Sequence, residues 1–259
     1  MSTTHHRSGH WNGAYCAHSG DQNEQEPVVL ELRQVSASYG PFRALFGVSL
    51  RVPHDSAVAL VGPNGAGKTT VARVLSGLLA PTAGQLVLHG EDVTGQPAHV
   101  LARRGIAHAN EGRSIFGSLT VEENLTLAFR TAFGRNGVTD ALDEAYAMFG
   151  RLGERRRQVA GSLSGGEQRM LTLARALVVR PAVLVADELS LGLAPIVVDE
   201  VYKLLHQVRH AGTSVVVIEQ HIDRALAFAD EVAVIDTGEI SWQGPTPALN
   251  SEIFAATFT

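Results

Sequence analysis

The sequence predicts an α/β fold in which a mostly parallel β-sheet is covered by helices on both faces. Short apolar segments alternate with longer segments of helical periodicity from residue 28 onward, which is typical of a parallel sheet. Two of the short segments, residues 183–186 and Ser214–Ile218, are apolar almost throughout, as expected for strands buried on both faces. A glycine-rich loop at residues 62–67 joins another such strand to a helix.

Turn residues and helix breakers delimit the individual elements. Apolar runs bounded by turn residues predict strands, at residues 28–35, 48–52, Ala57–Val61, 85–89, Ile106–Ala109, 183–186, Ser214–Ile218, 231–235 and 239–243. Helical spacing of apolar residues, with Pro near the ends of three segments, predicts helices at residues 68–79, 97–104, 121–130, 140–152, 166–179, Pro195–His210 and 222–229. The helical block from about 120 to 160 interrupts the alternation, so we expect it to be an inserted subdomain.

Composition excludes several classes of protein. The chain has 259 residues, of which 45% are hydrophobic, too many for a disordered chain. No run approaches 18 apolar residues and no secretory signal is expected, and the single cysteine fits a reducing compartment. The net charge of −5 argues against general nucleic-acid binding.

The first 26 residues differ from the rest in being polar and nearly free of aliphatic side chains, so we expect a disordered tail there. Their histidines and cysteine match no standard metal-site spacing; these residues are His5, His6, His10, His18 and Cys16.

The loop GPNGAGKT at residues 62–69 fits the phosphate-binding pattern GxxxxGK[ST], and it stands between a predicted strand and a predicted helix as that pattern requires. Glycines let consecutive backbone N–H groups surround phosphate oxygens, and the helix that follows points its positive end at the anion. Only two of the 21 basic residues are lysine, Lys68 and Lys203. We expect Lys68 to reach the β- and γ-phosphates and the Thr69 hydroxyl to ligate Mg²⁺.

Two further motifs extend this prediction. The strand at residues 183–186 ends in Asp187 and Glu188, which after a P-loop suit a Mg²⁺ ligand and a carboxylate that polarises the attacking water. The segment LSGGEQ at residues 163–168 stands just before a helix. It reads as a second anion-binding helix start, or as a capping box in which Ser164 and Glu167 bond reciprocally.

Over about residues 28–247 the chain resembles the ATP-binding cassette (ABC) family, with GPNGAGKT as Walker A, VLVADE as Walker B and LSGGEQ as the signature. The resemblance implies a P-loop NTPase core, an N-terminal antiparallel β subdomain and a helical subdomain at about 114–165, all within a domain spanning 27–259. In that family two cassettes pair head to tail, so the signature completes the partner's site. Tyr39 matches the aromatic that stacks on adenine, although it could equally pack at a core edge.

A finer resemblance is to LivF-type ATPase subunits of branched-chain amino acid importers, through EGRSIF (111–116), LTVEENL (119–125), SLGLAP (190–195) and IEQ (218–220). Glu111 stands where most cassettes carry Gln, and Gln220, followed by His221, stands where most carry the switch histidine. Both replacements look typical of that branch. They leave the potency of this site open, since Glu cannot donate a hydrogen bond and Gln cannot carry a proton.

The resemblance assigns residues to three roles. Catalysis is assigned to Glu188, Gln220 and His221, and the Mg²⁺ ligands are Thr69, Asp187 and Glu111. The ATP-binding set is Tyr39, Gly62, Pro63, Asn64, Gly65, Ala66, Gly67, Lys68, Thr69, Thr70, Glu111, Ser164, Gly165, Gly166, Glu167 and Gln168.

We therefore expect an ATP-hydrolysing importer subunit for branched-chain or related amino acids or amides, peripheral to the cytoplasmic face of a bacterial membrane. Its expected partners are a second cassette (the same or different), two integral permeases and, indirectly, an extracytoplasmic solute-binding protein, with no nucleic acid. Two alternatives stand beside this expectation. A soluble cassette acting on nucleic acid or ribosomes usually has two P-loops or a long coiled coil, and this chain has neither. A regulatory cassette with weak hydrolysis fits Glu111 and Gln220 but not Glu188.

Overall fold

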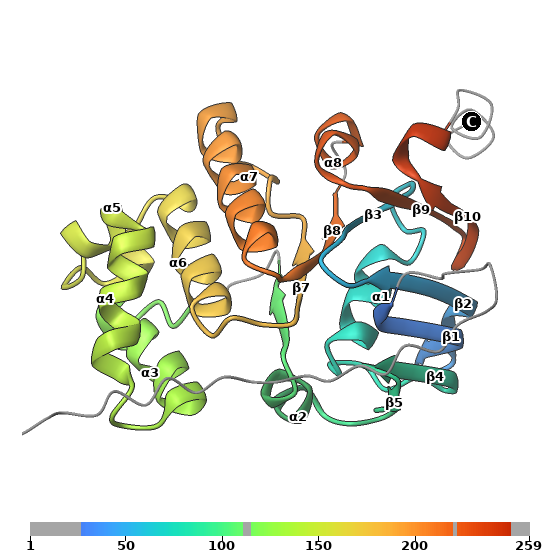
Figure 1. Ribbon diagram of the computed structural model, residues 1–259, viewed down its shortest axis with the longest axis horizontal. Coiled ribbons are helices and arrows are strands. Elements are labelled where there is room, and N and C mark those ends of the chain that lie inside the picture. Colours follow the sequence, from blue (N-terminus) through green and yellow to red (C-terminus); the bar gives the residue numbers. More distant parts are fainter. Residues whose placement is uncertain (1–26, 111–114, 220–221, 250–259) are drawn as a thin grey trace, which may run out of the picture.

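The computed structural model describes residues 27–110, 115–219 and 222–249 and contains two β-sheets (Figure 1). The smaller sheet is antiparallel, in the order β2-β1-β4-β5. Its strands are β1 (Val28–Tyr39), β2 (Phe42–Pro53), β4 (Ala83–Leu88) and β5 (Glu91–Asp92). This sheet is the expected N-terminal antiparallel β subdomain.

The larger sheet has the order β10-β9-β3-β8-β7-β6, and every neighbouring pair is parallel except β9 and β10. Its strands are β3 (Ala57–Val61), β6 (Ile106–Ala109), β7 (Val183–Asp187), β8 (Ser214–Ile218), β9 (Glu231–Asp236) and β10 (Glu239–Pro245). All residues of β3, β7 and β8 are buried, which confirms the prediction of strands covered on both faces. Because these strands are parallel, the segments that follow them meet at one edge of the sheet.

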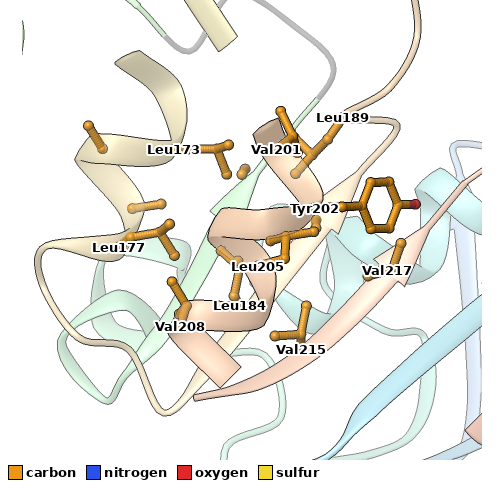
Figure 2. Packing of buried hydrophobic residues seen from close by; sticks show 14 of the residues in the cluster. Leu173, Leu177, Leu184, Leu189, Val201, Tyr202, Leu205, Val208, Val215 and Val217 are labelled. Carbon is orange, nitrogen blue, oxygen red and sulfur yellow. The ribbon is translucent and has the colours of Figure 1, made fainter. Parts of the chain in front are cut away.

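Helices cover both faces of the larger sheet and create two apolar cores. On one face α1 (Lys68–Leu75), α2 (Ala98–Arg103) and the antiparallel sheet pack against alternate residues such as Leu60 and Ile218. On the other face lie α6 (Gly165–Leu177), α7 (Pro195–His210) and α8 (Ile222–Phe228). Figure 2 shows this second core, where Val201, Leu205 and Val208 of α7 face β7 and β8. Their spacing of three and four residues puts them on one face of the helix.

The helical block lies between β6 and β7 and consists of α3 (Val121–Phe133), α4 (Val138–Met148) and α5 (Gly150–Glu154), with α6 beside it. It stands at the end of the molecule farthest from β1, β2 and β4 (Figure 1). The described residues include no helix that is long and apolar enough to cross a membrane.

Several element boundaries differ from the predictions. The helix predicted at 68–79 ends at Leu75 because the chain turns at Gly77, whose φ is +69°. The helix predicted at 140–152 is two helices, separated at Phe149 by a non-helical backbone with ψ of 68°. The first two strands form a hairpin around residues 40–41 and are longer than predicted. The predicted ranges are too short because exposed residues such as Phe42 interrupt the apolar pattern.

Candidate nucleotide-binding and catalytic site

The P-loop follows β3, and its lysine side chain folds back to bond to the start of the loop. Lys68 is 4% exposed, and its Nζ donates hydrogen bonds to the carbonyl oxygens of Gly62 (2.8 Å) and Pro63 (2.9 Å). Gly67, directly before α1, has φ of +108°, a conformation that favours glycine. The loop therefore has the glycine backbone that a phosphate cradle needs.

Neighbouring strands hold the P-loop from outside. A Cβ on Gly62 would lie 2.0 Å from the carbonyl oxygen of Ile235, so only glycine fits against β9. Gly238, in the turn between β9 and β10, donates its N–H to the carbonyl oxygen of Ala66 at 2.9 Å. The carbonyl oxygen of Gly238 in turn accepts from the N–H of Phe46 at 2.9 Å. The position of the loop thus depends on β2 and on the β9–β10 turn.

The P-loop and the acidic end of β7, which are far apart in sequence, come together here. Helix α1 contacts β7, which ends at Asp187, so Lys68 lies within electrostatic reach of Asp187 and Glu188. Burial lowers the pKa of Lys68, and the negative charges of Glu188 and Asp187 oppose that shift. A buried cation beside two buried carboxylates is the arrangement expected where a charged phosphate chain is to be held and attacked.

The backbone at Glu188 is unusual. Its φ is +49°, in the left-handed region that residues other than glycine seldom adopt. The N–H of Glu188 donates to the carbonyl oxygen of Ile218, at the end of β8, at 2.8 Å. Five other described residues besides glycine share this conformation, but all five are exposed, whereas Glu188 is buried.

Tyr39 ends β1, and its ring belongs to neither apolar core. Tyr39 is 39% exposed. Arg73 of α1 donates from Nη1 to Tyr39 Oη at 3.1 Å, and its guanidinium carbon lies 5.7 Å from the ring centroid. The sequence offered no signal for Arg73; the contact arises because the β1–β2 hairpin and α1 meet.

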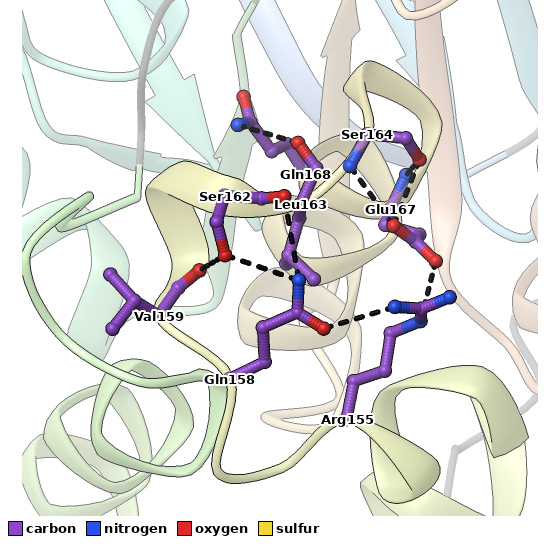
Figure 3. Close-up of polar contacts among 8 residues, drawn as sticks. All are labelled: Arg155, Gln158, Val159, Ser162, Leu163, Ser164, Glu167 and Gln168. Carbon is purple, nitrogen blue, oxygen red and sulfur yellow. Dashed lines mark hydrogen bonds and ion pairs between the residues drawn. The ribbon is translucent and has the colours of Figure 1, made fainter.

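The LSGGEQ segment forms the expected capping box at the start of α6 (Figure 3). Ser164 Oγ accepts from the N–H of Glu167 at 3.3 Å, while Glu167 Oε2 accepts from the N–H and from the Oγ of Ser164, both at 2.9 Å. The hydrogen bond from the Ser164 backbone lowers the pKa of Glu167. Arg155 Nε lies 2.7 Å from Glu167 Oε1, so the segment is tied to the helical block.

The remaining expected site residues differ in burial and in contacts, and some lie outside the described part of the chain. Thr69 is exposed and Thr70 buried in the first turn of α1, and Gln168 Nε2 donates to the carbonyl oxygen of Leu163 at 3.2 Å. Within the described part of the chain, the LSGGEQ segment and the P-loop share no hydrogen bond or ion pair. Glu111, Gln220 and His221 lie outside the described residues, as do residues 1–26 with their histidines.

Sequence comparisons with known proteins identify the family of this chain. A sequence profile of the ABC transporter family matches residues 45–190. The high-affinity branched-chain amino acid transport ATP-binding protein BraG of Pseudomonas aeruginosa is 40% identical over 82% of this chain and 91% of its own length. The probable branched-chain amino acid transport ATP-binding protein LivF of Archaeoglobus fulgidus is 34% identical over 83% of this chain and 92% of its own.

Solved structures agree with these relatives. An ATP-binding cassette of an ABC transporter, solved in its ADP conformation, is 25% identical, covers 84% of this chain and 91% of its own, and superposes with a TM-score of 0.73. The predicted fold class is thereby confirmed. The family profile, the two curated relatives and the P-loop core together show that this chain belongs to the ABC transporter family as an ATP-binding, ATP-hydrolysing cassette.

Proposed function

We propose that this chain powers an importer of branched-chain amino acids or related amino acids and amides. BraG and LivF are both described as branched-chain amino acid transport proteins, and each aligns with most of this chain. Two segments resemble that branch: SLGLAP follows β7, and IEQ begins with Ile218, the last residue of β8. In this proposal the ATPase domain spans residues 27–259, its helical subdomain lies at about 114–165, and the first 26 residues form a tail.

The observation that carries the ATPase part of the proposal is the position of Lys68, which closes the P-loop and lies within electrostatic reach of Asp187 and Glu188. Backbone N–H groups of the P-loop and the Lys68 ammonium would hold the β- and γ-phosphates. Glu188 would accept a hydrogen bond from the attacking water and orient it toward the γ-phosphorus. Tyr39 would stack on the adenine ring.

The residues present also suit Mg²⁺. The Thr69 hydroxyl, in the first turn of α1, and the Asp187 carboxylate, at the end of β7, are hard oxygen donors on two elements in contact. When bound, Mg²⁺ would neutralise charge on the β- and γ-phosphate oxygens. Glu111 is proposed as a further ligand, and Gln220 and His221 as residues that sense the γ-phosphate.

Assembly follows from the same proposal. Ser164, Gly165 and Gly166 would complete the site of a second cassette, identical or different, bound head to tail. Two integral permeases would receive the motion at the cytoplasmic face of the membrane, with an extracytoplasmic solute-binding protein delivering the solute and no nucleic acid involved.

The two lysines of the chain supply a matched test of the nucleotide site. Lys68→Ala should weaken ATP binding at least tenfold, because the buried ammonium that faces the phosphates is lost. Lys203→Ala, at an exposed position of α7, should leave ATP affinity unchanged. Equal ATP affinities for the wild type and Lys68→Ala, measured by titration calorimetry, would refute the site.

A second measurement tests the solute. ATP hydrolysis by the assembled transporter should rise when the binding protein is loaded with leucine, isoleucine or valine, and should not rise with unrelated solutes such as urea. Stimulation by urea and not by any aliphatic amino acid would contradict the proposed solute class while leaving the nucleotide site intact.

A further inference from the structure

A buried serine–carboxylate pair joins the segment after β7 to the end of β8. Ser190 is 3% exposed and Glu219 is 2% exposed. Ser190 Oγ donates to Glu219 Oε2 at 2.6 Å, and the N–H of Ser190 donates to Glu219 Oε1 at 3.0 Å. One residue thus engages both oxygens of a carboxylate that is shielded from water, where a hydrogen bond to a charged group is strong and its loss is costly.

This pair lies directly beside the unusual backbone of Glu188. The parallel pairing of β7 with β8 ends at Asp187 and Ile218, and the N–H of Glu188 then bonds to the carbonyl oxygen of Ile218. Ser190 bonds to the next residue along, Glu219. Residues 188 and 190 are therefore attached to residues 218 and 219 by consecutive contacts.

The residue between them is held as well. Leu189 is buried in the apolar core that also contains Val201 of α7 (Figure 2). The segment 188–190 is consequently fixed by a backbone hydrogen bond, by apolar packing and by the Ser190–Glu219 pair. Of these three, only the last depends on polar side chains that can be changed without altering the core.

We propose that the Ser190–Glu219 pair is a positioning device that keeps Glu188 in its left-handed conformation and so sets the direction of the Glu188 carboxylate. The inference rests on the catalytic role proposed above for Glu188. A left-handed residue that is not glycine returns to ordinary φ when its surroundings permit, and that return swings its Cα–Cβ bond. Without the pair, the 188–190 segment would relax and the carboxylate would turn away from the attacking water.

A second serine–carboxylate pair supplies a control for the removal of a buried serine hydroxyl. Ser56 Oγ donates to Asp230 Oδ2 at 3.3 Å, and the N–H of Ala57 donates to the same oxygen at 2.9 Å. Ser56 is buried like Ser190, but it precedes β3 and so lies at the opposite edge of the sheet from the P-loop. The Asp230 side chain is 43% exposed and also pairs with Arg209, so Ser56→Ala controls for the loss of a buried serine hydroxyl far from Glu188 and not for the loss of a buried carboxylate contact.

The experiment measures kcat, the KM for ATP and the ATP dissociation constant of the assembled transporter carrying full-length variants of this chain. Ser190→Ala should lower kcat at least tenfold while the dissociation constant stays within twofold, because the P-loop is untouched. Ser56→Ala should change neither. Glu219→Gln keeps the shape but leaves one acceptor oxygen where Ser190 uses two, so it should also lower kcat. The double variant should be no slower than the slower single variant.

Two outcomes would overturn the inference, and a further variant separates its failure from failure of the proposed role of Glu188. A folded Ser190→Ala or Glu219→Gln variant with kcat within twofold of the wild type would overturn the inference, as would losses that multiply in the double variant. The Glu188→Gln variant shows which of the two claims fails. If it is inactive while the Ser190 and Glu219 variants hydrolyse ATP normally, only the positioning inference fails; if it hydrolyses ATP at the wild-type rate, the proposed role of Glu188 fails first.

Discussion

Gly238 donates its backbone N–H to the carbonyl oxygen of Ala66 at 2.9 Å, so the turn between β9 and β10 bears directly on the P-loop. A Cβ on Gly238 would lie 2.5 Å from the carbonyl oxygen of Ala44 and 2.7 Å from Phe46 Cδ2. The turn therefore has no room for a side chain. A residue some 170 positions after the P-loop helps to determine the P-loop's shape.

Gly238→Ala should weaken ATP binding, because the turn must move away from β2 and Ala66 must follow it. The turn at His89 and Gly90 offers a close control: its φ values are +49° and +80°, against +48° and +82° at Thr237 and Gly238, but a Cβ on Gly90 meets nothing within 4 Å. Gly90→Ala should carry the same backbone strain and leave ATP affinity unchanged. Equal affinities for the two variants, measured by calorimetry, would show that the turn does not support the P-loop.

His108 should make the protein sensitive to acid. Burial, with a contribution from the charge of Arg73, lowers the pKa of His108 from 6.5 to about 4, and neither ring nitrogen has a hydrogen-bond partner among the described residues. Between these two values the unfolded chain binds a proton that the folded chain does not, so stability falls as the pH falls, by about 1.4 kcal/mol per unit.

Replacing His108 with Leu should remove this effect. The free energy of unfolding of His108→Leu should exceed that of the wild type by about 2 kcal/mol more at pH 5 than at pH 7.5, as measured by urea denaturation. Other titrating groups cancel in the comparison. A difference between the two proteins that stays constant with pH would contradict the proposed burial of a neutral imidazole.

The two capping boxes of the chain separate a structural role from a functional one. Thr120 with Glu123 caps α3 in the same way that Ser164 with Glu167 caps α6. Ser164→Ala and Thr120→Ala should each lower stability by about 1 kcal/mol, since each removes one N-cap. Only Ser164→Ala should also slow ATP hydrolysis by the assembled transporter, because Ser164 is proposed to contact nucleotide bound to the other cassette. Equal hydrolysis rates for both variants would confine Ser164 to capping.

Tyr39→Ala should weaken the binding of ATP but not of inorganic triphosphate, which has no base to stack on the ring. Arg73→Leu should have a smaller effect in the same direction, because it releases the Tyr39 hydroxyl without removing the ring. Competition titrations against a fluorescent nucleotide would measure both. A parallel loss for ATP and triphosphate in Tyr39→Ala would place the effect at the P-loop instead.

Local features of the sequence were sufficient for the parts of the site that depend on a few consecutive residues. The P-loop is set by glycines and by one lysine, and β7 by a continuous apolar run, so each was recognisable alone. The Ser190–Glu219 pair was not, because it joins the ends of two strands that become neighbours only through the sheet order. A polar residue just beyond each of two adjacent parallel strands was the available signal.

The break between α4 and α5 and the full length of β2 also escaped prediction. Phe149 is apolar and buried, as a helical residue facing the core would be, so nothing in the sequence indicates its non-helical backbone. Phe42 is exposed at the start of β2 because it lies at the end of a hairpin. No apolar core of the described residues packs there, so the sequence need not alternate between apolar and polar residues. Tertiary packing decides both positions.

The most direct test of the account is the steady-state ATP hydrolysis rate of the assembled transporter with Glu188→Gln in this chain. The substitution keeps the size and the buried position of the side chain but removes the carboxylate proposed to orient the attacking water. We predict a rate at least a hundredfold below that of the wild type, with ATP still bound. Hydrolysis at the wild-type rate would contradict the assignment of this site as the one where this chain cleaves ATP.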